Sequence, residues 1–191
     1  MSGTPLGELL DVPARDEWRA WLAAHHATAR EIWLVGHKKH TGKPSVPYNA
    51  AVEEALCFGW IDSVRKTVDG DRFAHRYTPR KARSGFSQTN KERLARLIAA
   101  GQVHPDVLAR LDRSAIDPAG YAMPDDILDA LKAEPAAWRF FQQTSPAYQR
   151  IRVAYVDHAR KRGDAFEKRL ANLLAKCAAG KQFGYGIEAY Y

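Results

Sequence analysis

The Asp69-Gly70 pair constrains the fold of this chain more than any other sequence feature. It separates two segments, 62–68 and 72–78, in which apolar and polar residues alternate. An Asp-Gly pair between alternating segments is a strong signal for a tight β-hairpin, because both residues accept positive φ angles. Alternation in the second segment predicts one face with Phe73, His75 and Tyr77 and another with Arg72, Ala74, Arg76 and Thr78. The chain therefore contains antiparallel sheet.

A third strand is predicted over residues 31–38. Its centre, Ile32 to Val35, is continuously apolar, which is typical of a strand covered on both faces. Apolar residues at helical spacing predict helices over 16–25 and 48–58, the second of which ends at a left-handed Gly59. We therefore expect an α+β fold with a small antiparallel sheet of about three strands packed with helices.

The second part of the sequence carries only helical patterns. Helices are predicted over 90–100 and 105–113, followed by a linker rich in proline and glycine. Further helices follow up to Gly180, with Ser145 as an N-cap before Pro146 and a capping box between Asp164 and Glu167. The predicted organisation is an α+β domain over 1–115, a linker over 116–124 and a helical unit over 125–191.

Composition limits the class of protein. Hydrophobic residues make up 46% of the 191, enough for a buried core, and the formal net charge of +7 favours acidic or phosphorylated partners. The sequence has no apolar run of about 18 residues and no secretory signal, so we expect a cytoplasmic protein with no membrane span. Cys57 and Cys177 lie in apolar helical patterns and are expected to be buried free thiols.

Motifs for catalysis and for cofactors are absent from the sequence. The loop from Gly36 to Lys43 lacks Walker A spacing and is followed by Pro44 rather than by a hydroxyl residue. The spacing of His37 and His40 does not suit joint metal ligation on a strand. The adjacent Glu53 and Glu54 are explained by the dipole of their helix. We expect no metal and no cofactor, and the sequence favours a binding protein over an enzyme.

A basic stretch over 72–91 is the most informative feature for binding. Arginines, lysines and aromatic residues are interspersed in this stretch, and it contains no Asp or Glu. Such a composition suits binding of a carboxylate or phosphate. Trp60 and Asp62 follow the Gly59 helix stop and could line a neighbouring pocket, unless Asp62 pairs structurally with Arg76 or Arg80. The predicted ligand-binding residues are Lys38, Trp60, Asp62, Arg76, Arg80, Lys81 and Ser84.

Two alternatives use the same stretch. The first is nucleic-acid binding, in which aromatic rings stack on bases and cations contact phosphates. The second is an enzyme acting on a small anion, with Asp62 as base and Arg76 and Arg80 as clamps. The cations of the nucleic-acid alternative are Arg72, Arg76, Arg80, Lys81 and Arg83.

Several stretches resemble the YdeI/OmpD-associated family, also described as OmdA-like or bacteriocin-protection proteins. They include Glu31–Val35, Lys38–Ser45, Ala51–Ser63, Arg76–Lys81, Pro124–Leu128, Pro135–Phe141, Ser145–Tyr148 and Ala159–Arg162. The resemblance implies a YdhG-like first part and a stress-response role in resistance to antimicrobial peptides, with a link to a porin and no established reaction. Because a net charge of +7 repels cationic peptides, we expect an indirect role through an anionic small molecule or an acidic protein partner.

Overall fold

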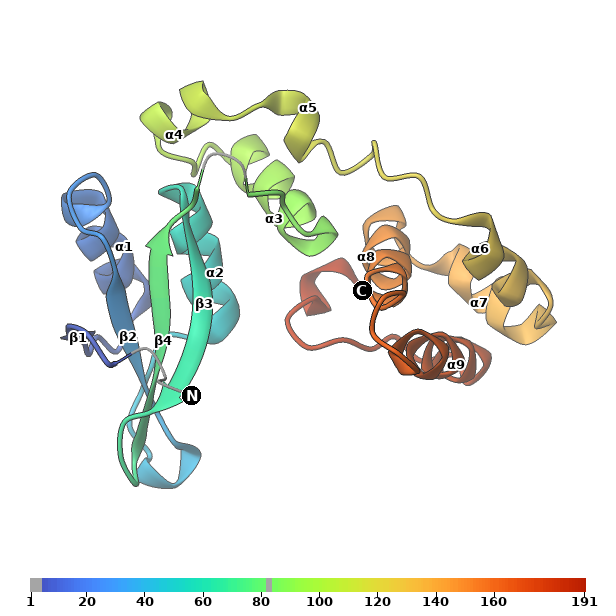
Figure 1. Ribbon diagram of the computed structural model, residues 1–191, viewed down its shortest axis with the longest axis horizontal. Coiled ribbons are helices and arrows are strands. Elements are labelled where there is room, and N and C mark those ends of the chain that lie inside the picture. The colour runs from blue at the N-terminus through green and yellow to red at the C-terminus, as the bar shows by residue number, and fades with distance from the viewer. Residues whose placement is uncertain (1–4, 82–83) are drawn as a thin grey trace. The chain divides into compact units, whose positions relative to one another are not determined.

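The computed structural model describes residues 5–81 and 84–191. The chain divides into two compact units, and the long helix α3 (Gln88–Ala99) contributes to both (Figure 1). The first unit comprises Met1–Gly85 and Arg96–Leu111, and the second comprises Phe86–Ala95 and Asp112–Tyr191. Arg83, one of the cations in the nucleic-acid alternative, lies outside the described residues.

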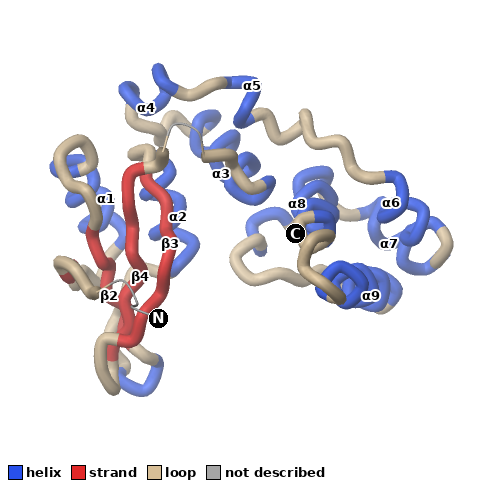
Figure 2. Tube along the Cα trace, in the orientation of Figure 1, coloured by secondary structure: helices blue, strands red, loops and turns tan. Residues whose placement is uncertain are grey.

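The first unit contains a four-stranded mixed sheet. Its strands are β1 (Leu9–Leu10), β2 (Ile32–His37), β3 (Trp60–Thr67) and β4 (Arg72–Pro79), in the order β1-β2-β4-β3 (Figure 2). Three strands are antiparallel, as predicted, and the predicted hairpin is β3-β4. The prediction missed β1, which pairs in parallel with β2, because two residues are too few to show alternation.

Helices α1 (Arg15–His25) and α2 (Tyr48–Cys57) cover one face of this sheet. The ring of Trp18 lies 5.2 Å from that of Tyr77, and the ring of Tyr48 lies 5.2 Å from that of His75. Pairing of Ile32 with Tyr77 and of Leu34 with His75 confirms the predicted faces of β4. Ile32 to Val35 are buried throughout, so the strand is covered on both sides, as its apolar run indicated.

Two short helices replace the single helix predicted over 105–113. They are α4 (Pro105–Arg110) and α5 (Arg113–Ile116), separated by an extended Leu111. The Asp112 carboxylate accepts hydrogen bonds from the backbone N–H groups of Ser114 and Ala115, which starts the second helix. The prediction failed because an N-capping aspartate in the middle of a helical pattern was not recognised as a boundary.

The second unit is helical, as predicted. It contains α6 (Asp125–Lys132), α7 (Pro135–Gln143), α8 (Pro146–Asp157) and α9 (Ala165–Ala178). Its core is made of Ile127, Leu131, Ala137, Phe141, Val153, Val156, Leu173 and Cys177. Ser145 caps α8 by accepting from the Tyr148 N–H, but Asp164 makes no capping bond and pairs with Lys168 instead. None of the helices in the described part of the chain is long and apolar enough to cross a membrane.

Both cysteines are free and buried, as predicted, and we expect them to be unreactive. Burial raises the pKa of the Cys57 and Cys177 thiols to about 11 each, so both remain protonated well above neutral pH. Native protein at pH 8 should therefore show almost no carbamidomethylation by iodoacetamide in intact-mass spectra. Protein unfolded in guanidinium chloride should take up two groups. Rapid labelling of the native protein would contradict the buried thiols.

Candidate anion-binding site

Two of the predicted ligand-binding residues are held on the helix-covered face of the sheet. Trp60 is fully buried, and its indole N–H donates to the backbone carbonyl of His26 at 3.0 Å. Asp62 pairs with Tyr77 across β3-β4, and its carboxylate accepts a hydrogen bond of 2.8 Å from the Tyr48 hydroxyl. Both side chains therefore take part in the packing between the sheet and its helices.

Arg76 lies on the opposite face of the sheet from Asp62. Arg76 precedes Tyr77 on β4, so the two side chains point to opposite faces of the sheet. The Arg76 guanidinium donates hydrogen bonds from Nε and Nη2 to the Glu31 carboxylate. Arg80 donates instead to the backbone carbonyls of Ser84 and Gly85 at 3.0 and 2.9 Å. The predicted ion pair of Asp62 with either arginine is therefore wrong.

The remaining predicted residues lie at the two ends of the hairpin. The Lys38 ammonium donates to the carbonyls of Asp69 and Gly70 at the turn. Lys81 and Ser84 follow the far end of β4, where the Ser84 N–H donates to the Lys81 carbonyl at 2.9 Å. The sheet thus separates the seven predicted residues between two faces and two ends. Their role in ligand binding stays a prediction.

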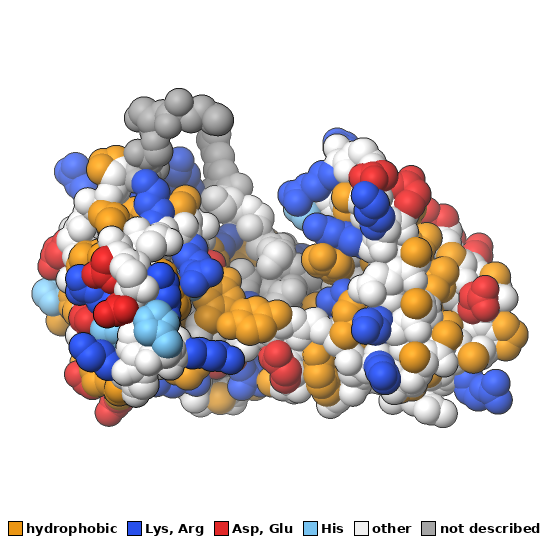
Figure 3. Space-filling model, turned by 90° about the horizontal axis from the view of Figure 1, so that it is seen from below, with side chains coloured by type: hydrophobic (Ala, Val, Ile, Leu, Met, Phe, Trp, Pro, Cys, Tyr) orange, Lys and Arg blue, Asp and Glu red, His pale blue; other side chains and the backbone are white. Residues whose placement is uncertain are grey.

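A polar pocket of about 290 Å³ lies beside the hairpin turn. It is lined by Asp11, His37, Thr41, Lys43, Asp69, Asp71 and Arg72. Its arginine is paired, since Arg72 lies 2.7 Å from the Asp69 carboxylate, and the His37 ring lies within hydrogen-bonding distance of Asp11, at 3.1 Å. The Arg72 hydrogen bond lowers the pKa of Asp69 to about 2. On the face shown in Figure 3, Lys and Arg side chains are likewise interspersed with Asp and Glu. This pairing weakens the case for nucleic-acid binding by the hairpin.

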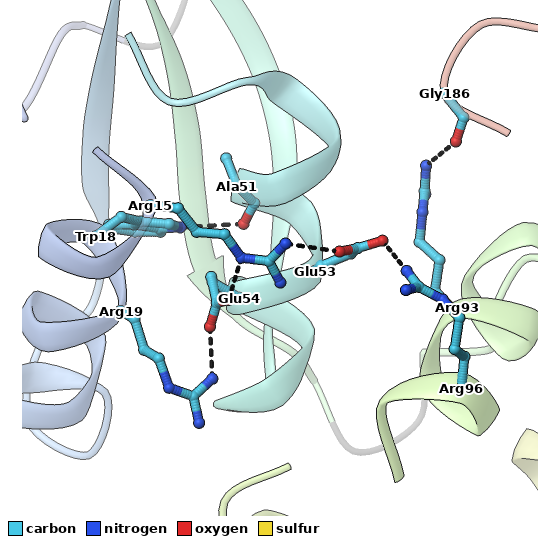
Figure 4. A network of polar contacts seen from close by, with 9 residues as sticks. All are labelled: Arg15, Trp18, Arg19, Ala51, Glu53, Glu54, Arg93, Arg96 and Gly186. Carbon is cyan, nitrogen blue, oxygen red and sulfur yellow. Dashed lines mark hydrogen bonds and ion pairs between the residues drawn. The ribbon is translucent and has the colours of Figure 1, made fainter. Parts of the chain in front are cut away.

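Glu53 and Glu54 are buried and form an ion-pair network between helices (Figure 4). Glu54 accepts from Arg15 Nε at 2.5 Å and from Arg19 Nη1 at 2.6 Å. Glu53 pairs with Arg15 at 3.2 Å and with Arg96. The helix-dipole interpretation of the two glutamates was therefore wrong. Each carboxylate is matched by guanidinium groups, so this network is suited to holding α1, α2 and the end of α3 together.

Arg152, on α8 in the second unit, is a buried cation of a different kind. Arg152 is only 5% exposed, yet no carboxylate among the described residues pairs with its guanidinium. Its Nε atom is enclosed and has no hydrogen-bond partner in that part of the chain. Buried arginines are almost always paired, because an uncompensated buried charge costs several kcal/mol. Among the residues that the structure describes, the Arg152 guanidinium therefore lacks the compensating charge that a buried arginine normally has.

Aromatic rings enclose the Arg152 guanidinium. Its central carbon lies 3.9 Å from the centroid of the Phe183 ring and 4.7 Å from that of the Tyr155 ring. Phe183 is fixed by Tyr148, whose hydroxyl accepts from the Phe183 N–H at 3.0 Å. Ring contacts of this kind attract a guanidinium by about 0.5–2 kcal/mol each, which offsets only part of the cost of burial.

Glycine is required where the chain passes over Arg152. A Cβ at Gly184 would lie 2.9 Å from Nη1 of Arg152 and 2.6 Å from Cδ1 of Ile187. The φ of Gly184 is also +131°, a value that other residues rarely adopt. The backbone thus approaches the guanidinium more closely than any side chain would allow.

A second guanidinium lies close to the first. The central carbon of Arg169 lies 3.9 Å from the Tyr155 ring centroid, and its Nη1 donates to the Tyr155 carbonyl at 2.7 Å. Arg152 and Arg169 therefore share one ring, which brings two positive charges close together. Burial lowers the pKa of Arg152, and the groups that oppose the shift are tyrosines and Cys177, with no carboxylate among them. We call Arg152, Tyr155, Arg169 and Phe183 the Arg152 site.

The Arg152 site was not predicted from the sequence, because a single arginine in a helix is normally exposed. A signal was nevertheless present. Tyr148, Arg152 and Tyr155 are spaced by four and three residues, which places them on one side of a helix. The later Gly184-Tyr185-Gly186 run is typical of a backbone that approaches another group closely.

Comparison with known families agrees with the two-part architecture, an α+β unit followed by a helical one. The chain belongs to the family described as "Domain of unknown function (DUF8412)", whose model matches residues 10–110. Residues 121–180 match the family described as "Bacteriocin-protection, YdeI or OmpD-Associated" (OmdA), which confirms the resemblance for the stretches from Pro124 to Arg162. The stretches from Glu31 to Lys81 lie instead in the region that the DUF8412 model matches. Searches of curated proteins and of solved structures found no match.

The Arg152 site lies mainly in the OmdA domain. Arg152, Tyr155 and Arg169 fall within residues 121–180, whereas Phe183 and Gly184 follow the matched region. The polar pocket beside the hairpin falls within residues 10–110. In residues 5–81 and 84–191, no three His, Cys, Asp or Glu side chains are placed to hold a metal ion.

Proposed function

We propose that this protein is an accessory binding protein for bacteriocin protection that captures an organic anion at the Arg152 site. The observation that carries the proposal is a buried guanidinium that has no carboxylate partner and an unbonded Nε within residues 5–81 and 84–191. The match of residues 121–180 to the OmdA family supplies the connection with bacteriocin protection. Without ligand, the positive charge of Arg152 is uncompensated by the described residues, and a bound anion would neutralise it.

The geometry favours a planar anionic group. Phe183 and Tyr155 contact the guanidinium within ring-stacking distance, so an anion would approach along its edge. The edge of a guanidinium presents parallel N–H donors that match the two oxygens of a carboxylate or phosphate. An apolar or aromatic part of the ligand would lie against the exposed ring of Tyr155.

Charge also bears on how such a protein could protect a cell. A protein with a formal net charge of +7 repels cationic peptides at long range, so direct capture of those peptides is disfavoured. Binding of an anion instead allows an indirect role in resistance. The cytoplasmic location remains a prediction from the sequence.

Binding of small anions tests the proposal directly. We expect benzoate, acetate and inorganic phosphate to shift the Nε–H signal of Arg152 in ¹H–¹⁵N spectra of the full chain, because that proton lacks a partner without ligand. Arg152→Gln should weaken benzoate binding by about tenfold or more, since a charge-assisted hydrogen bond contributes about 1.5–3 kcal/mol. The matched control is Arg160→Gln, because Arg160 also lies over a ring, that of Phe166, but is paired with Asp126 and Asp157.

The same variants test the role in cells. A strain lacking the gene should become more sensitive to bacteriocins and cationic peptides, and wild-type protein or Arg160→Gln should restore resistance. Arg152→Gln should not restore it at equal protein abundance. Full protection by Arg152→Gln, or an Arg152 Nε–H signal that none of the three anions moves, would overturn the proposal.

A further inference from the structure

Three exposed tyrosines lie in the Arg152 site or in the C-terminal segment that passes over it. In the described part of the second unit, the large apolar side chains that remain exposed are Tyr155, Tyr185 and Tyr191, and Tyr185 is exposed to 82%. Tyr155 contacts the guanidinium, and Tyr185 follows Gly184 in the chain. The Tyr191 hydroxyl donates to the Gly184 carbonyl at 2.9 Å. We call these three side chains the tyrosine rim.

We infer that the tyrosine rim and Arg152 form a docking surface for an acidic segment of a partner protein. An Asp or Glu side chain of the partner would neutralise Arg152, while its neighbouring apolar residues would cover the tyrosine rings. This inference rests on the anion site proposed above and names the source of the anion.

Charge and residue types favour a protein segment as the occupant. Tyrosine and arginine are enriched among the residues that contribute most to protein interfaces, where a desolvated centre is surrounded by apolar contacts. Arg152 supplies a desolvated cation with which no described carboxylate pairs, and Tyr155 and Tyr191 supply exposed rings at the site. A single buried positive charge is matched by one carboxylate side chain, and Arg169 adds positive potential nearby.

A nucleic-acid strand fits the surface less well. Strand binding needs a row of available cations that follows the phosphates, together with aromatic rings for the bases. Other cations of the second unit are instead paired with carboxylates, since Arg160 pairs with Asp126 and Asp157 and Lys168 pairs with Asp164. Arg169 is held by the Tyr155 carbonyl. The observations therefore support a site for one anionic group and do not support a row of cations that could contact successive phosphates.

The segment that carries the rim is already fixed in place. Phe183 exchanges hydrogen bonds with the Tyr148 hydroxyl, and Arg93 donates to the Gly186 carbonyl at 2.7 Å (Figure 4). The Ser145 hydroxyl donates to the Tyr190 carbonyl. Such a surface loses little conformational entropy when a partner binds, which favours affinity.

Matched peptides test the inference on the full-length protein. The first probe is an N-acetylated, C-amidated peptide with one Asp between Leu and Phe, and the second has Asn in place of that Asp. NMR titration of the Gly184 and Gly186 amides should show the Asp peptide binding about tenfold or more tightly, because only the carboxylate pairs with Arg152. Tyr185→Ser should weaken the Asp peptide about fivefold, and Arg152→Met should remove the preference for Asp. Arg160→Gln should leave both affinities unchanged.

The outcomes separate this inference from the anion site itself. If benzoate moves the Arg152 Nε–H signal but the Asp and Asn peptides bind equally, the docking surface is wrong and the anion site stands. If neither benzoate nor the peptides act at Arg152, both proposals are wrong. Tighter Arg152-dependent binding of an oligothymidylate than of the Asp peptide would also overturn the inference, in favour of nucleic acid.

Discussion

Replacing Arg152 with methionine should raise the free energy of unfolding of the ligand-free protein by about 1–3 kcal/mol, although binding at the site is lost. Wild-type protein buries a guanidinium that no carboxylate of the described residues compensates. Burial lowers the pKa of Arg152, so the folded state disfavours its charged form. Methionine fills a similar length without a charge, and its sulfur packs well against the rings of Phe183 and Tyr155.

Two opposing effects decide the sign of this change. The ring contacts that Arg152 loses contribute about 0.5–2 kcal/mol each, whereas desolvation of an unpaired ion costs several kcal/mol. The desolvation cost is the larger, so removal of the charge should stabilise the fold. A gain in stability with a loss of binding is typical of residues kept for function.

Urea unfolding followed by the Trp138 indole N–H signal in ¹H–¹⁵N spectra tests this expectation in the second unit, because Trp138 packs against its core. The control is Arg160→Met, which removes an exposed cation paired with two carboxylates and should leave stability unchanged or slightly lower. If Arg152→Met instead lowers the midpoint, Arg152 is a structural residue held by its ring contacts. The anion-site argument would then lose its physical basis.

The elements of the fold could largely be predicted because their signals are local. The Asp69-Gly70 turn, the apolar run in β2 and the helical spacing of α6 to α9 each lie within a few consecutive residues. Where such signals were too short or ambiguous, the prediction failed. The two residues of β1 show no period, and Asp112 looks like a helix residue until its capping bonds are seen.

The site could not be predicted because its residues are brought together by distant parts of the chain. A count of charges along residues 72–91 gives a basic stretch, but Glu31 neutralises Arg76 across the sheet and Asp69 neutralises Arg72 at the turn. Conversely, an isolated Arg152 is unremarkable in sequence and becomes distinctive only when Phe183 and Gly184 enclose it. Charge pairing and burial depend on tertiary contacts that residue types alone do not specify.

The largest loss of stability is expected in the first unit, at Glu54. Its side chain is nearly fully buried and accepts hydrogen bonds from Arg15 on α1 and Arg19, one turn further along that helix. Glu54→Ala removes the common partner of both arginines and leaves a cavity beneath them. Because these guanidinium groups are 41% and 39% exposed, water can solvate them partly, so we expect a loss of about 3 kcal/mol, the lower end for a broken buried pair.

Two further variants complete this test: one separates charge from shape at Glu54, and the other is a control at an exposed glutamate. Glu54→Gln keeps the volume but not the charge, and should lose less than Glu54→Ala, because the amide oxygen can still accept from one guanidinium. Glu17→Ala, on the exposed side of α1, should cost only about 0.3–1 kcal/mol through the helix dipole. Thermal unfolding followed by Trp fluorescence measures all three. If Glu54→Ala unfolds at the wild-type temperature, the ion-pair network does not hold α1 against α2, and the aromatic packing of Trp18 on Tyr77 must do so alone.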